Sequence, residues 1–518
     1  MSALNGNAAD YFIDRHLREG RGERIAFADP WRNLSYGELH AASARFAAGL
    51  RAAGIERERR IALLLLDTVD FPIAFWGAIR AGIVPVPINT LLPAETVAYI
   101  LSDSRAAALV VSAPLLAPLQ EALAGIDTLR DVWVSRPDGS VAGGDSLAAL
   151  LAGAVSDPAP AACSPDEVAF WLYSSGSTGM PKGVRHLHSS LKATADTYAA
   201  EILRLGPDDV MFSAAKLFFA YGLGNSMTFP MAVGASAVLL PDRPTPDAVL
   251  ATLRRAQASV FAGVPTLYAA LLAHPELAAG AGSERLRLCI SAGEPLPEHV
   301  GRRWHDAVGS DILDGIGSTE MLHIFLSNRP DDLRYGTTGK AVTGYEVRIV
   351  DAAGAEIADG ESGELVVRGP SAAEGYWNQR AKSRLTFRGE WTHTGDTYTR
   401  DADGYYRYCG RSDDMLKVGG IWVSPFEVEE ALIGHKAVFE AAIVGHPDVD
   451  GLIKPKAFVV LQDSARDDDP ARLRTALQDV VKARIGVWKY PRWIEFVDTL
   501  PKTATGKIQR YKLREPSG

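Results

Sequence analysis

The strongest chemical signal in the sequence is a loop rich in Gly, Ser and Thr, which contains one Lys, in WLYSSGSTGMPKGV at residues 171–184. An apolar run precedes the loop, as when a buried strand opens into a turn. Its glycines permit close approach of the backbone to a ligand, and its hydroxyls and Lys182 suit phosphate oxygens. Lys182 lies between Pro181 and Gly183, unlike the Lys of a Walker A loop. The pattern favours a polyphosphate site of another kind over the alternative, a surface hairpin.

A second cluster is DILDGIGSTE at residues 311–320, where a short apolar run leads into a turn with Gly and hydroxyl side chains. Glu320, beside Thr319, is a candidate Mg²⁺ ligand, because this ion prefers hard oxygen ligands and usually takes only one or two carboxylates. Taken alone, a Glu just after a turn is also typical of an ordinary helix N-terminus.

Two further groups lie nearer the C-terminus. Asp396 follows Thr394 and Gly395, and Arg411 comes soon after. A carboxylate and an arginine suit a ribose diol, although charges in turns are more often simply solvated. PKTATGKIQR, at residues 501–510, places Lys507 in a Gly-containing loop after a strand-like run. A lysine in such a tail is a functional candidate only because the other motifs occur in the same chain.

The elements that position these motifs alternate between apolar strand-like runs and Ala/Leu-rich helical patterns, which predicts an α/β fold. The first four are expected at residues 35–53, 60–66, 71–81 and 84–88. Ligands of such sheets bind beyond the carboxyl ends of the strands. Short strands and turns predict a mostly β subdomain over about 344–411, and a small α+β unit follows. We predict a large N-terminal domain at 1–411 and a mobile C-terminal domain at 412–518.

Composition narrows the function class. The 518 residues are 47% hydrophobic and 23% charged, which is ordinary for a folded globular enzyme. A net charge of -9 without a basic block argues against nucleic-acid binding. The three cysteines are too far apart for a disulfide framework or a zinc site. No secretion signal is evident and the apolar runs are too short for a membrane span, so we expect a cytoplasmic protein.

Six motifs in order resemble those of the adenylate-forming superfamily, which contains acyl- and aryl-CoA synthetases, luciferases and peptide-synthetase adenylation domains. They are YSSGSTGMPKGV, SAGEPLP, DGIGSTE, TGD, GRSDDMLKVGG and PKTATGKIQR. The resemblance covers essentially the whole chain. NAADYFIDRHLREGRGERIAF, KLFFAYGLGN and GGIWVSPFEVE further resemble the benzoate-CoA ligase branch. The family activates an acid with ATP and Mg²⁺ as acyl-AMP, releases pyrophosphate, rotates its C-terminal domain and transfers the acyl group to coenzyme A.

The resemblance also implies roles for individual residues. Thr178 and Glu320 would bind Mg²⁺, and Lys507 would lie between the substrate carboxylate and the α-phosphate. Asp413 aligns with the family's hinge residue. The family's lysine at position 507 can be acetylated, which would remove its charge. The coenzyme A tunnel would involve Lys417, Gly419 and Gly420. The ATP-binding residues would be Ser174, Ser175, Gly176, Ser177, Thr178, Gly179, Lys182, Gly293, Glu294, Pro295, Asp314, Gly315, Ile316, Thr319, Asp396 and Arg411.

A short, flat acid pocket is implied by analogy with aryl-CoA ligases, although core packing explains several of its members equally well. Its residues would be Phe219, Ala220, Tyr221, Gly222, Ala292, Gly317, Leu322, His323 and Ile324. The expected substrate is benzoate or a small ring analogue such as a fluorobenzoate, a hydroxybenzoate or a heteroaromatic acid. Because one methylene changes discrimination by only about 1 to 3 kcal/mol, the sequence does not rank these acids.

Other activities remain open from sequence. Within the superfamily the nearest are a medium-chain or cinnamoyl-type acyl-CoA ligase and a stand-alone adenylation enzyme that loads a carrier protein. A nucleotide-binding regulator without catalysis is disfavoured by the intact Thr178, Glu320 and Lys507. Luciferase-like oxidation has no supporting feature. Relatives include monomers and dimers, and a homodimer is the favoured state.

Overall fold

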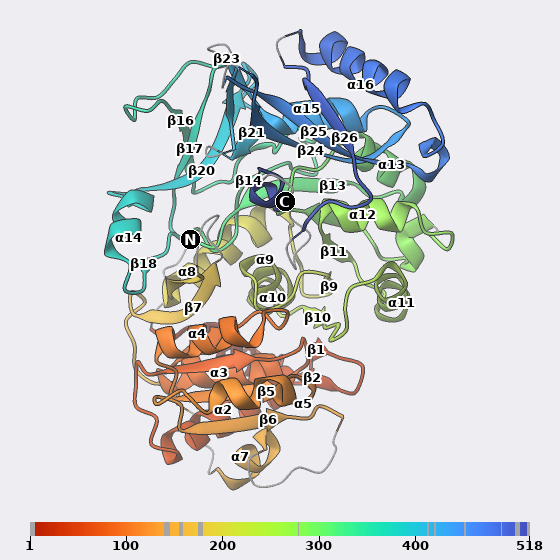
Figure 1. The fold of residues 1–518 in the computed structure, drawn as a ribbon. Coiled ribbons are helices and arrows are strands. Elements are labelled where there is room, and N and C mark those ends of the chain that lie inside the picture. Colours follow the sequence, from red (N-terminus) through yellow and green to blue (C-terminus); the bar gives the residue numbers. More distant parts are fainter. Residues whose placement is uncertain are drawn as a thin grey trace. The chain divides into compact units, whose positions relative to one another are not determined.

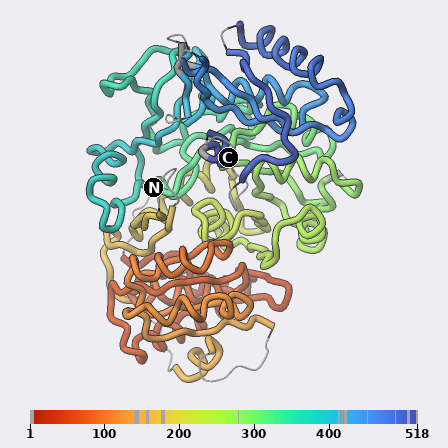
Figure 2. Tube along the Cα trace, in the orientation of Figure 1, coloured from red at the N-terminus to blue at the C-terminus, as the bar shows by residue number. Residues whose placement is uncertain are grey.

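The computed structural model describes residues 6–138, 146–154, 159–174, 180–277, 279–411, 414–418, 421–449, 452–487, 489–502 and 508–514 of the chain. The chain forms two compact units, the first made of Met1–Val347 and Val367–His393 and the second of Arg348–Val366 and Thr394–Gly518. Figures 1 and 2 follow the chain from red at the N-terminus to blue at the C-terminus. Helices and strands alternate through most of the first unit, so the predicted α/β class is confirmed.

A nine-stranded sheet is the centre of the first unit. The six middle strands are parallel, and an antiparallel strand pairs at each side of them. The strands in order are β15 (Lys340–Ala341), β14 (Ile324–Ser327), β13 (Ile312–Gly317), β12 (Leu288–Ser291), β11 (Val260–Gly263), β9 (Val210–Ser213), β10 (Ser236–Val238), β1 (Ile25–Ala28) and β2 (Asn33–Ser35).

Three helices cover one face of this sheet. A shared apolar core includes Phe261 of β11, Leu253, Tyr268 and Trp304. The helices that contribute to it are α11 (Pro246–Ala256), α12 (Pro265–Leu272) and α13 (Glu298–Val308). Thr245 begins α11 by accepting a hydrogen bond from the Ala248 amide, with Pro at the first helical position. This cap fixes where α11 begins.

A four-stranded parallel sheet is built by the first third of the chain. Its order is β4 (Val84–Pro87), β3 (Arg60–Leu64), β5 (Ala108–Ser112) and β6 (Asp131–Ser135). Helices α2 (Tyr36–Ala52), α3 (Asp70–Ala81) and α4 (Ala94–Ser104) pack with it, in the red and orange part of Figure 1. A Cβ on Gly77 would lie 2.6 Å from a ring carbon of Phe46, so this glycine permits the close approach of α2 and α3.

The Gly- and Ser-rich loop is flanked by an antiparallel hairpin of β7 (Val168–Ser174) and β8 (Lys182–Leu187). Ser174 pairs with Lys182 at the loop end of this hairpin. A third strand, β18 (Gly375–Tyr376), pairs antiparallel with β8 and brings a segment from far along the sequence beside this hairpin.

A smaller mostly β region agrees with the texture predicted after residue 344. Its strands are β16 (Glu346–Val350), β17 (Ser362–Arg368), β20 (Trp391–Arg400) and β19 (Phe387–Arg388), with β21 (Tyr406–Arg411) beside β20. Helix α14 (Arg380–Thr386) precedes β19. Strands β16, β17 and β20 contain residues of both compact units. The predicted domain boundary between 411 and 412 stays a prediction.

The C-terminal part of the second unit is a small α+β body. Strands β24 (Val438–Pro447), β25 (Ile453–Leu461) and β26 (Trp493–Phe496) form its sheet, and β22 (Leu416–Val418) pairs with β23 (Ile421–Val423). Helices α15 (Pro425–Ile433) and α16 (Pro470–Ile485) share an apolar core with this sheet and are drawn in blue in Figure 1. The last helix is α17 (Arg510–Arg514).

The remaining helical segments connect these elements. They are η1 (Asp10–Asp14), α1 (Arg15–Arg18), α5 (Ala113–Leu116), η2 (Ala117–Leu119), α6 (Gln120–Leu123), α7 (Leu147–Gly153), α8 (His188–Thr194), η3 (Ala195–Ile202), α9 (Ala220–Leu223), η4 (Gly224–Thr228), α10 (Phe229–Val233), η5 (Ala279–Gly282) and η6 (Asp463–Ala465). Among the described residues, every helix is too short or too polar to cross a bilayer.

Candidate active site

Several predicted site residues of the first unit lie at one edge of the nine-stranded sheet. Strands β11, β12 and β13 are adjacent and parallel, so their carboxyl ends share that edge. The segment Ala292, Gly293, Glu294 and Pro295 follows β12, and Thr319 and Glu320 follow β13. This is the edge at which ligands of open α/β sheets bind.

Two glycines in β13 are required by close backbone approach. A Cβ on Gly317 would lie 2.5 Å from the carbonyl oxygen of His323, and one on Gly315 would lie 2.9 Å from that of Leu326. Gly293, by contrast, has a φ of +94° and no atom within 4 Å of an added Cβ. The backbone is therefore tightly packed under β13 and open at Gly293, where the adenine slot is predicted.

Glu320 is held by a tyrosine and a lysine. The Tyr376 hydroxyl donates a hydrogen bond to Glu320 Oε1 at 2.7 Å. Lys182 Nζ donates to the Tyr376 oxygen at 2.8 Å and lies 3.2 Å from Glu320 Oε1. The Lys182 and Glu320 side chains are only 18% and 16% exposed. The structure therefore joins the lysine of the first motif to the carboxylate of the second through a residue that neither motif contains.

Sequence reasoning missed Tyr376. It reaches the cluster because β18 pairs with β8 and because the Ala373 amide donates a hydrogen bond to the Glu320 carbonyl at 2.8 Å. A lone Tyr in a short apolar segment carries no distinguishing signal, and its partner Lys182 is 194 residues away in sequence. Only the pairing of the strands reveals its place.

The charge state of Glu320 follows from this environment. Burial acts to raise the pKa of the carboxyl, but the Lys182 ammonium, the Tyr376 hydroxyl and a backbone amide together hold that pKa below its ordinary value. Glu320 is therefore an anion at neutral pH. An ionised carboxylate is chemically suited to Mg²⁺, and one such group is enough for an ion that also binds substrate phosphates.

The loop between β7 and β8 belongs partly to the described structure. Ser174 ends β7, and its hydroxyl oxygen is buried without a hydrogen-bond partner among the described residues. For Lys417 the structure describes the backbone in β22 but not the side chain. The predicted site residues outside the described part of the chain are Ser175, Gly176, Ser177, Thr178, Gly179, Asp413, Gly419, Gly420 and Lys507.

Aromatic rings surround His323, which follows Leu322 in the predicted acid pocket. Tyr221 stacks against the imidazole with centroids 5.6 Å apart, and Tyr198 and Phe229 lie at 5.0 and 4.5 Å. His323 is 3% exposed, and neither ring nitrogen has a hydrogen-bond partner among the described residues. Burial lowers the pKa of His323 to about 3. The imidazole is therefore neutral at physiological pH, and its ring packs among these three aromatic side chains.

Helix α9 is fixed against the sheet by Tyr221. Its hydroxyl donates to the carbonyl oxygens of Ile290 at 3.1 Å and Gly263 at 3.3 Å, at the ends of β12 and β11. Gly222 and Gly224 permit this placement. A Cβ on Gly222 would lie 2.0 Å from the Lys216 carbonyl oxygen, and one on Gly224 would lie 2.6 Å from a ring carbon of His323.

The other predicted residues of this edge are mostly buried. Asp314 is 5% exposed, and burial raises the pKa of its carboxyl well above the ordinary value. Ala292, Leu322 and Ile324 are 4%, 2% and 1% exposed, whereas Thr319 is partly exposed. Leu322 has a φ of +66°, a left-handed conformation that is costly for a branched residue and is often found at functional sites.

The predicted ribose pair lies in the second unit. Asp396 of β20 and Arg411 of β21 are opposite each other, and Arg411 Nη1 donates to Asp396 Oδ1 at 3.0 Å. The same guanidinium donates to the Thr394 carbonyl at 3.2 Å. The structure thus brings these two predicted residues together, which their spacing in sequence did not indicate.

The flanks of the Lys507 loop are well anchored in the second unit. Lys502 and Ile508 form an isolated β-bridge on either side of it. Arg510 makes a bidentate pair with Glu429, at 2.9 and 2.8 Å, and Glu429 is 5% exposed. Burial raises the pKa of Glu429 despite this pairing. Sequence reasoning missed the pair, since Glu429 is an ordinary helix residue by its pattern.

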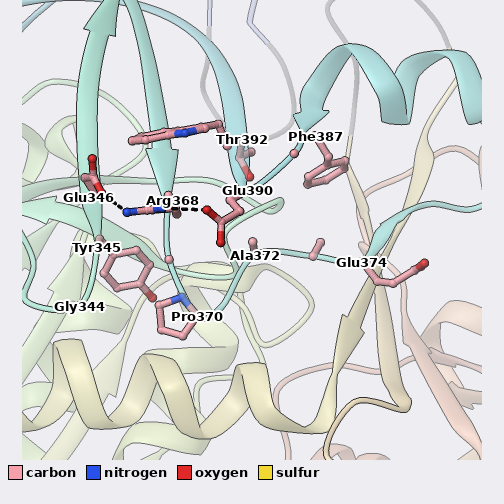
Figure 3. Close-up of a pocket in the computed structure, with 14 residues that line it drawn as sticks. Gly344, Tyr345, Glu346, Arg368, Pro370, Ala372, Glu374, Phe387, Glu390 and Thr392 are labelled. Atoms are coloured by element: carbon pink, nitrogen blue, oxygen red, sulfur yellow. Dashed lines mark hydrogen bonds and ion pairs between the residues drawn. The ribbon is translucent and has the colours of Figure 1, made fainter. Parts of the chain in front are cut away.

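A separate cavity of about 660 Å³ lies in the β region of the first unit, and the predicted site residues are absent from its described lining. Figure 3 shows Arg368 between the carboxylates of Glu346 and Glu390. The Trp391 ring lies 5.4 Å from the Arg368 guanidinium. Arg368 is paired with two carboxylates of this cavity, and Glu374 is paired with Arg185 outside its lining, so we assign no reaction to it.

The AMP-binding enzyme family matches residues 14–377, and the AMP-binding enzyme C-terminal domain family matches residues 427–507. The chain is 55% identical to 4-hydroxybenzoate--CoA/benzoate--CoA ligase of Rhodopseudomonas palustris, with 99% of this chain and 95% of the relative covered. A benzoate CoA ligase structure from Burkholderia xenovorans LB400 is 49% identical, with a TM-score of 0.90 and coverage of 99% and 100%. An anthranilate CoA ligase in complex with anthranoyl-AMP is 40% identical, with a TM-score of 0.92 and coverage of 99% and 97%.

Proposed function

Because the chain belongs to the AMP-binding enzyme family, we propose that it is an ATP- and Mg²⁺-dependent aryl-CoA ligase for benzoate or a small ring analogue. The observation that carries the proposal is that the candidate residues for the acid and for the phosphates gather at one edge of the nine-stranded sheet. Tyr221 comes after β9 in the chain, and Glu320 and His323 come after β13. The stacked rings of Tyr221 and His323, which we call the aromatic wall, would face the acid, and the ionised Glu320 would serve the phosphates. An aromatic acid and a polyphosphate are the two reactants that such an edge suits.

The reaction has two balanced steps. An acid carboxylate oxygen attacks the α-phosphorus of ATP, an acyl-AMP anhydride bond forms, and pyrophosphate leaves. The thiolate of coenzyme A then attacks the acyl carbonyl, a thioester forms, and AMP leaves. The first step brings two anions together, so fixed positive charge at the phosphates lowers its barrier most.

Lys182 and Glu320 have complementary roles in this scheme. Lys182 pairs with the pyrophosphate end of ATP together with Ser174 and Ser177. Glu320, held ionised by Lys182 and Tyr376, would hold Mg²⁺ with Thr178. When bound, the ion supplies charge that neutralises phosphate oxygens. Tyr376 keeps the carboxylate oriented, because its hydroxyl bonds to one carboxylate oxygen and leaves the other out of that bond.

The acid lies against the neutral imidazole of His323 and the ring of Tyr221. A flat aromatic acid gains from such rings, because offset-stacked and edge-to-face pairs contribute about 0.5 to 1.5 kcal/mol beyond apolar burial. The other pocket residues that we propose are Phe219, Ala220, Gly222, Ala292, Gly317, Leu322 and Ile324. A long acyl chain gains nothing comparable from the rings.

The remaining roles rest on the family resemblance and on local chemistry. Lys507 supplies the cation that the carboxylate and α-phosphate need when they meet, and Asp413 acts as the hinge. Thr319 contacts the α-phosphate, and Lys417, Gly419 and Gly420 serve coenzyme A. The loop residues Ser175, Gly176 and Gly179 contact the phosphates of ATP. The adenosine site consists of Gly293, Glu294, Pro295, Asp314, Gly315, Ile316, Asp396 and Arg411.

A product assay tests the proposal. Purified protein with ATP, Mg²⁺ and coenzyme A is given benzoate, fluorobenzoates, pyridine carboxylates, cinnamate, octanoate and palmitate in parallel. The expected result is an aryl-CoA thioester together with AMP and pyrophosphate, with benzoate-sized acids preferred. Preference for octanoate or palmitate would overturn the aryl assignment. Transfer only to a phosphopantetheinylated carrier protein, with none to coenzyme A, would instead make the chain a carrier-loading enzyme.

Three further properties stay predictions on the same basis. They are a homodimer in solution, a cytoplasmic location and acetylation of Lys507, which would remove the cation. Light scattering of the purified protein checks the first. Loss of adenylation on chemical acetylation, reversed by a deacetylase, checks the last.

A further inference from the structure

A buried polar side chain lies in the helical run that contains Tyr221. Asn225 is 0% exposed, and both its amide oxygen and its amide nitrogen are buried without a hydrogen-bond partner among the described residues. An amide left unpaired in the interior is costly and therefore rare. Asn225 also lies in η4, a π-helical turn, and such turns are frequent at functional sites.

The helical face on which Asn225 lies is the one that meets His323. Segments α9, η4 and α10 are consecutive and form one continuous helical run, visible beside β9 and β10 in Figure 1. Residues three and four apart share a helix face. Tyr221, Gly224 and Phe229 all approach the His323 ring. Asn225 is four residues after Tyr221 and four before Phe229, so it belongs to this face.

The exposure of the side chains decreases along this face. Tyr221, like the two residues before it, is only partly buried, whereas Asn225 is 0% and Thr228 is 1% exposed. Thr319, Glu320 and Lys182, which serve the phosphates in the proposed function, are also only partly buried. The carboxylate of a bound acid must point toward the phosphates. Its ring then extends along the face toward Asn225.

The chemistry of the amide selects among ring substituents. Its oxygen accepts a hydrogen bond and its nitrogen donates one. A hydroxyl can donate to Oδ1 or accept from Nδ2, and an amino group can donate to Oδ1. A hydrogen atom, a methyl group or a halogen leaves the amide unpaired. A site built to hydrogen-bond a substrate group discriminates strongly against the analogue that lacks it.

We propose that Asn225 is a specificity-determining residue that recognises a hydroxyl or amino substituent on the ring of the aromatic acid. The proposal rests on the function proposed above and names its substrate class: monohydroxylated or amino-substituted benzoates. Benzoate itself fits the aromatic wall but leaves the Asn225 amide unpaired.

The test compares acids of nearly equal shape. Acid-dependent pyrophosphate exchange is measured with benzoate, with the three monohydroxybenzoates and with the three methylbenzoates, since a methyl group replaces a hydroxyl in size without its hydrogen bond. In the unchanged protein, at one ring position, kcat/KM for the hydroxy acid should exceed that for the methyl acid by roughly 10- to 100-fold. The aminobenzoates show whether an amino group replaces the hydroxyl.

A variant series assigns this preference to Asn225. Asn225→Leu keeps the side-chain size but removes the amide, so the hydroxy-to-methyl ratio should fall to near one while benzoate is still used. Thr68→Val is the matched control. Thr68 is 0% exposed and its hydroxyl is also unpartnered among the described residues, but it lies between β3 and α3 of the four-stranded-sheet part of the chain. This variant should keep the ratio.

The outcomes separate this proposal from the proposed function. Exchange with benzoate but equal rates for hydroxy and methyl acids at every ring position would overturn the Asn225 assignment alone, as would a preference that Asn225→Leu retains. Absence of exchange with every aromatic acid in the unchanged protein would overturn the proposed function first. If Asn225→Leu does not fold, Asn225→Thr replaces it, and the hydroxy-to-methyl ratio of the unchanged protein still decides the proposal.

Discussion

Replacing Tyr376 by Phe removes one hydroxyl that bonds to two charged groups. The hydroxyl lies 2.7 Å from Glu320 Oε1 and 2.8 Å from Lys182 Nζ. A hydrogen bond to a charged group contributes about 1.5 to 3 kcal/mol. Without it, the Lys182 ammonium, which already lies 3.2 Å from Glu320, pairs with the carboxylate more directly and competes with ATP. We therefore expect kcat/KM for ATP to fall by about 10- to 100-fold in Tyr376→Phe.

The kinetics with benzoate serve as a comparison for the kinetics with ATP in the same variant. The Tyr376 hydroxyl bonds to Glu320 and Lys182, which we assign to ATP and Mg²⁺, so KM for benzoate should change by less than about 3-fold, well under the effect on ATP. Steady-state pyrophosphate exchange with ATP and benzoate varied separately measures both constants. Tyr36→Phe is the matched control, because Tyr36 is also buried and its hydroxyl donates to the Ala235 carbonyl at 2.8 Å. It should lose similar stability but keep its ATP kinetics.

The same variant has a pH signature. The pKa of Glu320 is held below its ordinary value, so the stability this group contributes is present above its unfolded pKa and is lost as pH falls through the folded value. Removing the Tyr376 hydroxyl raises the pKa of Glu320, so the acid limb of the kcat/KM profile should move to higher pH. Unchanged ATP kinetics and an unchanged acid limb, with only the loss of thermal stability seen in Tyr36→Phe, would refute the role of Tyr376.

Three further predictions follow from the site and from the second unit. Lys507→Ala should lower adenylation by about 10² to 10³ while largely sparing thioester formation from supplied acyl-AMP; near-normal pyrophosphate exchange would contradict its role. Gly224→Ala places a Cβ 2.6 Å from the His323 ring, so KM for benzoate should rise by about 10-fold or more with KM for ATP unchanged, and equal effects on both would count against the acid assignment. Glu429→Gln leaves Arg510 without its bidentate partner, and thermal or denaturant unfolding should show a loss of about 3 kcal/mol, whereas an unchanged midpoint would show that the pair contributes little.

The sequence predicted helices and strands well where the hydrophobic periodicity and the residues that begin or end a helix agree. The helix expected at 35–53 is α2, because Ser35 and Glu38 form a capping box at its start. The helix expected at 71–81 is α3, which ends at Gly82 with a φ of +73°. In both, the signal lies within one turn of the boundary, so the sequence alone carries it.

Long-range pairing explains what sequence reasoning missed. Tyr376 joins Glu320 and Lys182 only because β18 pairs with β8, and no spacing within either motif encodes that pairing. Asn225 lies in an apolar helical run, and its missing partner is visible only after the interior is packed. Asp396 and Arg411 were both predicted at the ribose, yet their contact depends on the register of β20 and β21. Motifs therefore identified the chemistry, and the fold identified the groups that orient it.

The central claim is that this chain joins an aromatic carboxylate to AMP before any thiol takes part. Isotope exchange between pyrophosphate and ATP, measured with purified protein, Mg²⁺ and benzoate or a monohydroxybenzoate in the absence of coenzyme A, tests it most directly. The account predicts exchange that requires the acid, and AMP with an aryl-CoA thioester once coenzyme A is added. No exchange with any aromatic acid, or release of ADP and phosphate in place of AMP and pyrophosphate, would contradict it.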